Sequence, residues 1–133
     1  MRQLPMVLLA GLALHLAAPL SAAPEAPAPS PQMSVAAFLE RVGTLAKTGP
    51  EWTLSPEASK LFAAISETGK AYRQTLAQRR AAGQPVEACL PDTAEIDSDA
   101  LFAHLAGYSA EAARQTSIAD AFAALVRAKF PCG

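Results

Sequence analysis

Ala88-Cys89-Leu90-Pro91 and Phe130-Pro131-Cys132-Gly133 frame the last third of the chain and hold both of its cysteines. Cys89 precedes a predicted pair of helices, and Cys132 lies at the end of the chain. Two cysteines allow only one intramolecular disulfide. We expect the bond Cys89–Cys132 to tie the C-terminal tail to the loop that follows the longest predicted helix.

The beginning of the chain has the layout of a secretory signal peptide. A basic start at residues 1–3 precedes an apolar stretch at residues 4–20, and small residues follow at 21–23 as a cleavage region. The alternative is a membrane anchor, but a spanning helix needs roughly 20 apolar residues, and this stretch is shorter and contains prolines. We therefore predict a signal peptide over residues 1–23 and a periplasmic or secreted mature protein without a membrane span.

Export is the reason to expect a disulfide rather than two thiols, because disulfides persist in oxidising compartments. A crosslink that closes a loop of this length stabilises a fold by roughly 4 kcal/mol when it is counted as chain entropy. The alternatives are a pair of buried free thiols, or a metal site. The metal site is the poorer one, since one cysteine pair and one histidine supply too few soft ligands.

Composition bounds the size and class of the mature protein. Removal of the signal peptide leaves about 110 residues, enough for one domain. Arg2 would leave with it, so ten cations would face twelve acids, a net charge of −2. This balance argues against a nucleic-acid-binding protein, which needs a basic face. Alanine is abundant while valine and isoleucine are few, which favours helices over strands.

Residues 24–32 are rich in proline and form a predicted linker to a helical domain at residues 33–133. Proline favours extended chain and does not support a helix interior. The segment also lacks large apolar residues, so it has nothing to pack. We expect it to be disordered and dispensable for stability.

Four stretches of the domain have apolar residues at the three- and four-residue spacing of a helix. The first begins after the N-cap Ser34 and ends at Gly49-Pro50. The second and longest begins at Ser55-Pro56-Glu57 and ends at Gly83. Its apolar row is Ala58, Leu61, Phe62, Ile65, Tyr72 and Leu76.

The third stretch is capped by Asp97 or Ser98 and stops at Gly107-Tyr108, and the fourth begins at Ser117 and runs to about Lys129. Short connections join the four stretches. We therefore predict an all-α fold, a small four-helix domain with one disulfide.

The loop between the second and third predicted helices carries charges of only one sign. Its acids are Glu87, Asp92, Glu95 and Asp97, with Asp99 just beyond them, and no lysine or arginine occurs between Arg80 and Arg114. One interpretation is a solvated loop that also caps the next helix. The other is an acidic surface that docks a basic cleft, because complementary charge speeds encounter and selects partners. We take these acids as candidate partner-binding residues.

Two aromatic residues are further candidates for a partner site. Trp52 lies in the short connector before the longest helix, where it either plugs the core or is exposed to a partner, since aromatic residues concentrate binding energy. Tyr108 follows the third helix. His104, the one histidine of the mature chain, has no nearby nucleophile and is expected to be structural or exposed. No phosphate loop, metal motif or catalytic triad is present in the sequence, so we predict neither an enzyme nor a cofactor.

The last third of the chain contains a set of residues that points to a known family: Cys89-Leu90-Pro91, Leu101 and Leu105, Ala121-Phe122, and Phe130-Pro131-Cys132. Through these residues it resembles the Rap/Tai immunity proteins. The shared pattern is a Cys-x-Pro, a stretch of amphipathic helix and a terminal Phe-Pro-Cys, mainly over residues 88–132. The resemblance implies a small periplasmic helical protein, often a homodimer, that inhibits a secreted peptidoglycan amidase of type VI secretion by direct binding.

Two other functions stay open at this point. One is a small periplasmic acid-stress chaperone, helical and held by one disulfide, which would expose apolar surface when its carboxylates become protonated. The other is an envelope accessory domain of unassigned function.

Overall fold

The structure is a computed structural model that describes residues 26–133. The predicted signal peptide at residues 1–23 lies outside the described residues, as does the start of the predicted linker at residues 24–32. Within the described part, five α-helices and one short 3-10 helix form the fold, and no β-strand is present. The predicted all-α fold is therefore confirmed.

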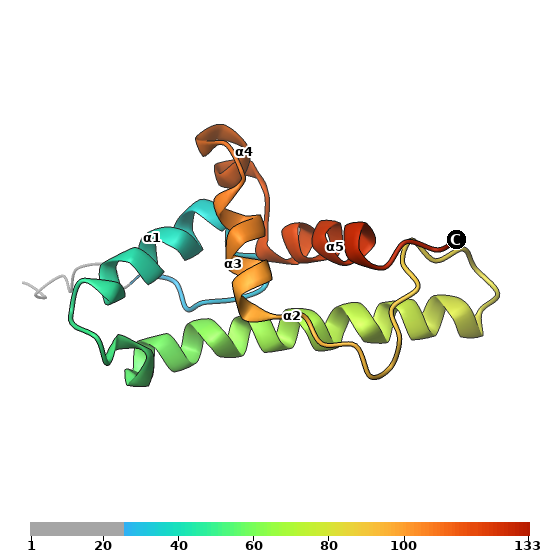
Figure 1. Cartoon of the computed structure of the whole chain (residues 1–133), viewed down its shortest axis with the longest axis horizontal. Coiled ribbons are helices and arrows are strands. Elements are labelled where there is room, and N and C mark those ends of the chain that lie inside the picture. The colour runs from blue at the N-terminus through green and yellow to red at the C-terminus, as the bar shows by residue number, and fades with distance from the viewer. Residues whose placement is uncertain (1–25) are drawn as a thin grey trace, which may run out of the picture.

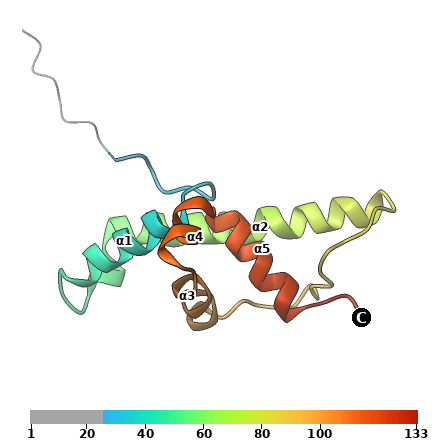
Figure 2. The same cartoon turned by 90° about the horizontal axis from the view of Figure 1, so that it is seen from above.

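A single long helix, α2 (Pro56–Ala81), runs the length of the molecule (Figure 1). Helices α1 (Val35–Ala46) and α5 (Ile118–Lys129) pack against it, whereas α3 (Ser98–Ala106) packs against α1 and α5, and α4 (Ala110–Gln115) packs against α1. In both views α5 lies beside α2, while α1 joins the opposite end through a short connection (Figure 2). No helix in residues 26–133 combines the length and the apolar character that crossing a membrane requires. In chain order the elements are α1 (Val35–Ala46), the 3-10 helix η1 (Trp52–Leu54), α2 (Pro56–Ala81), α3 (Ser98–Ala106), α4 (Ala110–Gln115) and α5 (Ile118–Lys129).

Short polar side chains begin the helices, as the sequence indicates. Ser34, Ser55 and Ser117 each accept a hydrogen bond from the backbone N–H three residues later, which satisfies one free donor of the first helical turn. Of the two candidate caps for the third predicted helix, Asp97 holds the position, and its carboxylate accepts from the Ala100 N–H.

The short helix α4 is an addition to the four predicted helices. Ser109 caps it and accepts from the Ala112 N–H, and Arg114 forms a salt bridge with Glu111 across one turn. Only Ala113 of this helix is buried. Six residues with one buried alanine give no apolar period, so the spacing rule does not detect the helix.

The core draws its side chains mainly from α1, α2, α3 and α5. Its largest fully buried side chains are Phe38, Leu61, Leu105, Ile118, Val35 and Val126. Gly69 of α2 marks the close approach of α5, because a Cβ there would lie 3.5 Å from Cζ of Phe122. Tyr72, one turn further along α2, meets the same phenylalanine edge-on with ring centroids 6.1 Å apart.

The first turns of α1 and α5 cap each other. The Val35 N–H donates to the carbonyl of Thr116 at 2.9 Å, and the Ile118 N–H donates to the carbonyl of Met33 at 2.9 Å. Each first helical residue thus bonds to the residue just before the other helix's cap. This reciprocal pair gives partners to two donors that a helix start otherwise leaves to water.

The N-terminal segment, residues 26–33, is in contact with the helices, in contrast to the disorder expected for residues 24–32. The Pro31 carbonyl accepts from the Ala119 N–H at 3.0 Å, and the Pro27 carbonyl accepts from the Arg41 guanidinium at 2.5 Å. Proline lacks a backbone donor but keeps its acceptor. The proline carbonyls therefore attach this segment to α5 and α1 although it has no large apolar residue to bury before Met33.

Candidate functional site

The disulfide fixes the loop that carries the predicted acidic site. Cys89 and Cys132 are bonded, with their Cα atoms 4.9 Å apart, which confirms the predicted pairing. The Cys89 N–H also donates to the Phe130 carbonyl at 2.8 Å. Ala88 and Leu90 on either side are buried. The loop is therefore attached to the end of α5 by one covalent bond, one hydrogen bond and two buried side chains.

Arg73 of α2 holds the same loop from the other side. Its guanidinium donates to the carbonyl of Pro91 at 3.2 Å, to that of Asp92 at 3.5 Å, and to that of Ala94. A planar group with five donors is suited to hold several acceptors at once. The path of the loop from α2 to α3 therefore depends on a residue outside the loop.

Glu87 is neutralised within the fold, which corrects the prediction of five acids without a cation. Its carboxylate accepts from the Tyr72 hydroxyl at 3.1 Å and forms a salt bridge with Arg127 of α5 at 3.1 Å. Burial is the main cause that raises the pKa of the Tyr72 phenol to about 12, and the charge and hydrogen bond of Glu87 contribute to this rise. Glu87 thus links α2 to α5.

The other acids of the loop have different surroundings. Asp97 caps α3 and is partly committed to that helix. Asp92, Glu95 and Asp99 are exposed and form no salt bridge with any described residue. We call these three residues the acidic edge, and they are what remains of the predicted acidic surface.

Tyr108 and His104 belong to the end of α3. Their rings meet edge-on with centroids 5.4 Å apart, and the Tyr108 hydroxyl lies 3.4 Å from Nε2 of His104. Tyr108 is half-buried and packs against the hydrophobic core. This packing gives it a structural role, and the structure does not bring it together with Trp52 on one surface.

Trp52 lies outside the core cluster of the described residues, so it does not plug the core. Its ring is half-exposed and lies 6.1 Å from that of Phe62 in α2. Leu54 is 78% exposed and Phe62 is 37% exposed. We call Trp52, Leu54 and Phe62 the apolar corner. The sequence places Phe62 in the inward row of α2, but the adjacent Leu61 occupies the buried direction.

The backbone holds this corner in place. Successive hydrogen bonds run from the Trp52 N–H to the Gly49 carbonyl, from the Leu54 N–H to the Glu51 carbonyl, and from the Ser55 N–H to the Trp52 carbonyl. Gly49 has φ 133°, a conformation that other residues rarely adopt, so it permits the sharp exit from α1. The connection is therefore a short ordered turn.

Leu54 lacks the apolar packing partner that a residue just before a helix N-cap commonly has. It directly precedes the N-cap Ser55, where an apolar residue commonly packs against the fourth residue of the helix. That fourth residue is Ser59, which is polar and bonds to the Ser55 carbonyl instead. The exposure of Leu54 is thus not part of the usual helix start.

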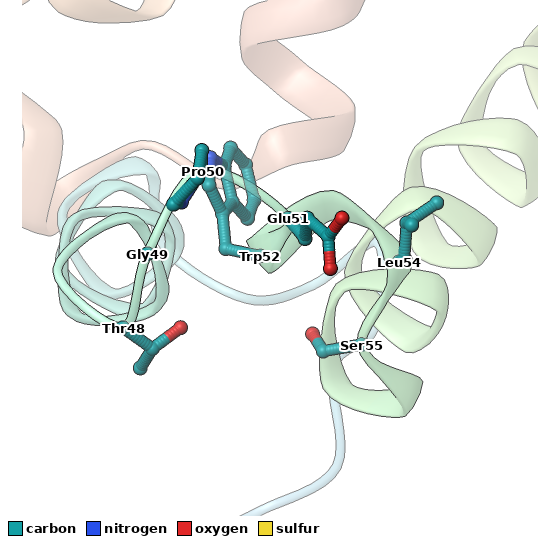
Figure 3. Close-up of a pocket in the computed structure, with 7 residues that line it drawn as sticks. All are labelled: Thr48, Gly49, Pro50, Glu51, Trp52, Leu54 and Ser55. Carbon is teal, nitrogen blue, oxygen red and sulfur yellow. The ribbon is translucent and has the colours of Figure 1, made fainter.

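A shallow pocket of about 480 Å³ lies beside the apolar corner, between the end of α1 and the start of α2 (Figure 3). Figure 3 shows the hydroxyl groups of Thr48 and Ser55 turned toward the space between them, and the Leu54 side chain turned away from it. Glu51 is the one charged residue of the lining. The lining consists of Thr48, Gly49, Pro50, Glu51, Trp52, Leu54 and Ser55.

No group of three or more metal-ligating side chains occurs within residues 26–133. Comparisons with protein-family models, with curated proteins and with solved structures found no match.

Proposed function

We propose that the protein is an exported helical domain that binds another protein and inhibits it, in the manner of the Rap/Tai immunity proteins that act on secreted peptidoglycan amidases. The disulfide supports an oxidising compartment, because such bonds persist outside the cytoplasm. The similarity of the last third of the chain to the Rap/Tai family supports an amidase as the partner.

The apolar corner is the observation that carries the proposal of protein binding. Trp52 and Leu54 lie in the 3-10 helix η1, the ring of Phe62 in α2 lies 6.1 Å from that of Trp52, and Leu54 and Phe62 are exposed to solvent. Large aromatic side chains supply much of the energy at protein interfaces. The turn is already ordered by its backbone hydrogen bonds, so binding costs little further loss of conformational freedom.

The acidic edge has a secondary role in this proposal. Asp92, Glu95 and Asp99 are exposed charges on a loop that Arg73 and the disulfide hold in place. Exposed charges at the rim of an interface mainly set the association rate and its salt dependence. The free energy of binding is expected to come chiefly from the apolar corner.

A protection assay tests the proposal. Peptidoglycan amidases of type VI secretion are directed one at a time to the periplasm of a susceptible bacterium, with and without this protein. We expect one of them to be neutralised, and the purified pair to form a complex. Leu54→Glu should abolish protection, because it replaces the most exposed apolar side chain of the apolar corner by a charge.

Gln74→Glu is the matched control, since it adds the same charge at an exposed position of α2 outside the apolar corner. It should protect as the parent does. If no amidase of the panel is bound or neutralised, the immunity function is contradicted. If the two variants behave alike, the apolar corner is not the binding surface.

A further inference from the structure

We infer that the pocket beside the apolar corner binds a basic side chain of the partner protein, and arginine in preference to lysine. This inference rests on the proposed function, because it names the chemistry of the group that the partner brings to this surface. Three features of the pocket carry it: an unpaired carboxylate, two hydroxyl oxygens and an indole ring.

The carboxylate of Glu51 supplies the negative charge. Glu51 is exposed, and it forms no salt bridge with the described part of the chain. The nearest cations in the sequence are Lys47 and Lys60, and Lys60 pairs with Glu57 at 3.6 Å. Lys47 does not line the pocket. The pocket is therefore open to a cation from another molecule.

The two hydroxyl groups offer acceptors to the pocket, and only that of Ser55 also keeps a hydrogen to donate. The Thr48 hydroxyl donates its hydrogen to the Leu45 carbonyl at 2.7 Å, so only its lone pairs remain for the pocket. Ser55 Oγ accepts from the Ala58 N–H and keeps further capacity. Since guanidinium and ammonium groups only donate hydrogen bonds, a lining rich in acceptors matches them.

Trp52 decides between the two kinds of basic side chain. A cation is attracted to the face of an indole, and tryptophan is the best of the aromatic residues for this contact. A guanidinium is planar, so it can lie against the ring while its N–H groups bond to a carboxylate. An ammonium is a compact and strongly hydrated charge. Trp52 and Glu51 together therefore favour arginine.

The larger groove of the molecule does not offer the same chemistry. It has a volume of about 920 Å³ and lies between the N-terminal segment, α1 and the start of α2. Its lining holds two cations, Arg41 and Lys60, which lie 3.9 Å and 3.6 Å from Glu57 and would repel a basic side chain. The lining of the pocket at Glu51, in contrast, has a carboxylate and no cation, as a basic side chain requires.

Trp52 is the only tryptophan of the chain, so its fluorescence reports on this pocket without a label. The probes are three acetylated and amidated tripeptides, Leu-Arg-Leu, Leu-Lys-Leu and Leu-citrulline-Leu. Citrulline has the shape of arginine without its charge. We expect the arginine peptide to change the fluorescence at millimolar concentration, the lysine peptide to bind more weakly, and the citrulline peptide to bind at least tenfold more weakly.

Glu51→Gln should remove the preference for arginine over citrulline, while Glu67→Gln, an exposed change elsewhere on α2, should keep it. Equal responses to the arginine and citrulline peptides, or an unchanged preference in Glu51→Gln, would overturn the inference. Either result leaves the proposed function standing if Leu54→Glu still abolishes protection. Loss of the arginine preference in both variants would equally overturn the assignment to Glu51.

Discussion

Glu87 joins two helices that lie far apart in the sequence. Its carboxylate accepts from Tyr72 in α2 and pairs with Arg127 in α5. No spacing rule connects residues 87 and 127, so the sequence could not show that this acid has a cation. A run of one charge predicts a charged surface only where no distant residue folds onto it.

The titration of Tyr72 tests this junction. Burial and Glu87 raise the pKa of Tyr72 from 10.0 to about 12. Glu87→Gln should lower this pKa, but not fully to 10.0, because burial is the larger cause. The measurement is the ultraviolet absorbance of the phenolate in a Tyr108→Phe background, which leaves Tyr72 as the only tyrosine.

The same shift predicts how stability changes with pH. The folded protein holds the Tyr72 proton more tightly than the unfolded chain does, so the linked stabilisation is present below pH 10.0 and is lost as the pH rises toward about 12. Tyr72→Phe should lose less stability than the parent over this window. An unaltered Tyr72 pKa in Glu87→Gln would show that the carboxylate does not interact with the phenol.

Arg73 gives a second prediction at the scale of one residue. Arg73→Lys should destabilise the protein by about 1–2 kcal/mol, since an ammonium cannot hold the carbonyls of Pro91, Asp92 and Ala94 together. Denaturant unfolding measures the loss, and hydrogen exchange should show faster opening in residues 84–97. The control is Arg80→Lys, at an exposed position in the last turn of α2. It should leave the free energy of unfolding and the hydrogen exchange of the loop unchanged.

At the scale of elements, sequence patterns predicted the features that depend on residues close together in the chain, such as the starts of helices. Serine caps and apolar spacing located the starts of α1, α2 and α5. Contacts between distant segments were not accessible in this way: the reciprocal bonds of Val35 and Ile118, and the acceptor at Pro31, depend on how α1 and α5 meet. Helix α4 was missed for a different reason, since it buries a single alanine.

The N-terminal segment offers a test of whether its contacts with the distant helix α5 contribute to stability. A protein that begins at Ser34 loses the Met33 and Pro31 acceptors of α5 and should be about 1–2 kcal/mol less stable than one that begins at Ala26. Its melting temperature should fall by roughly 4–8 °C per kcal/mol. A protein that begins at Gln32 keeps Met33 and should fall between the two. Equal melting of all three would restore the interpretation of a dispensable linker.

At the scale of the molecule, the candidate site was only partly predictable. Trp52 was identified because a lone tryptophan in a connector is conspicuous. Leu54 and Glu51 were not, because their exposure and lack of partners are properties of the folded turn. Phe62 fits a helical period, but a period cannot tell which of two adjacent apolar residues faces the core.

The disulfide gives a prediction for the whole domain. Mass spectrometry of the purified protein should show both cysteines protected from alkylation until reductant is added. Cys89→Ser with Cys132→Ser should lower the free energy of unfolding by about 2–5 kcal/mol. Free thiols in the protein isolated from an oxidising compartment would contradict the bond.

The position of the bond also determines how the molecule responds to force. Cys89 and Cys132 are 43 positions apart, so tension applied to the oxidised protein from outside this loop bypasses α3, α4 and α5. The chain before Cys89 can be drawn out, but the loop between the cysteines cannot. Reduction should release about 150 Å of additional contour length in an optical-tweezers trace. Helices α3 to α5 therefore form a covalently closed unit that tension cannot unravel, while α1 and α2 are the part that yields.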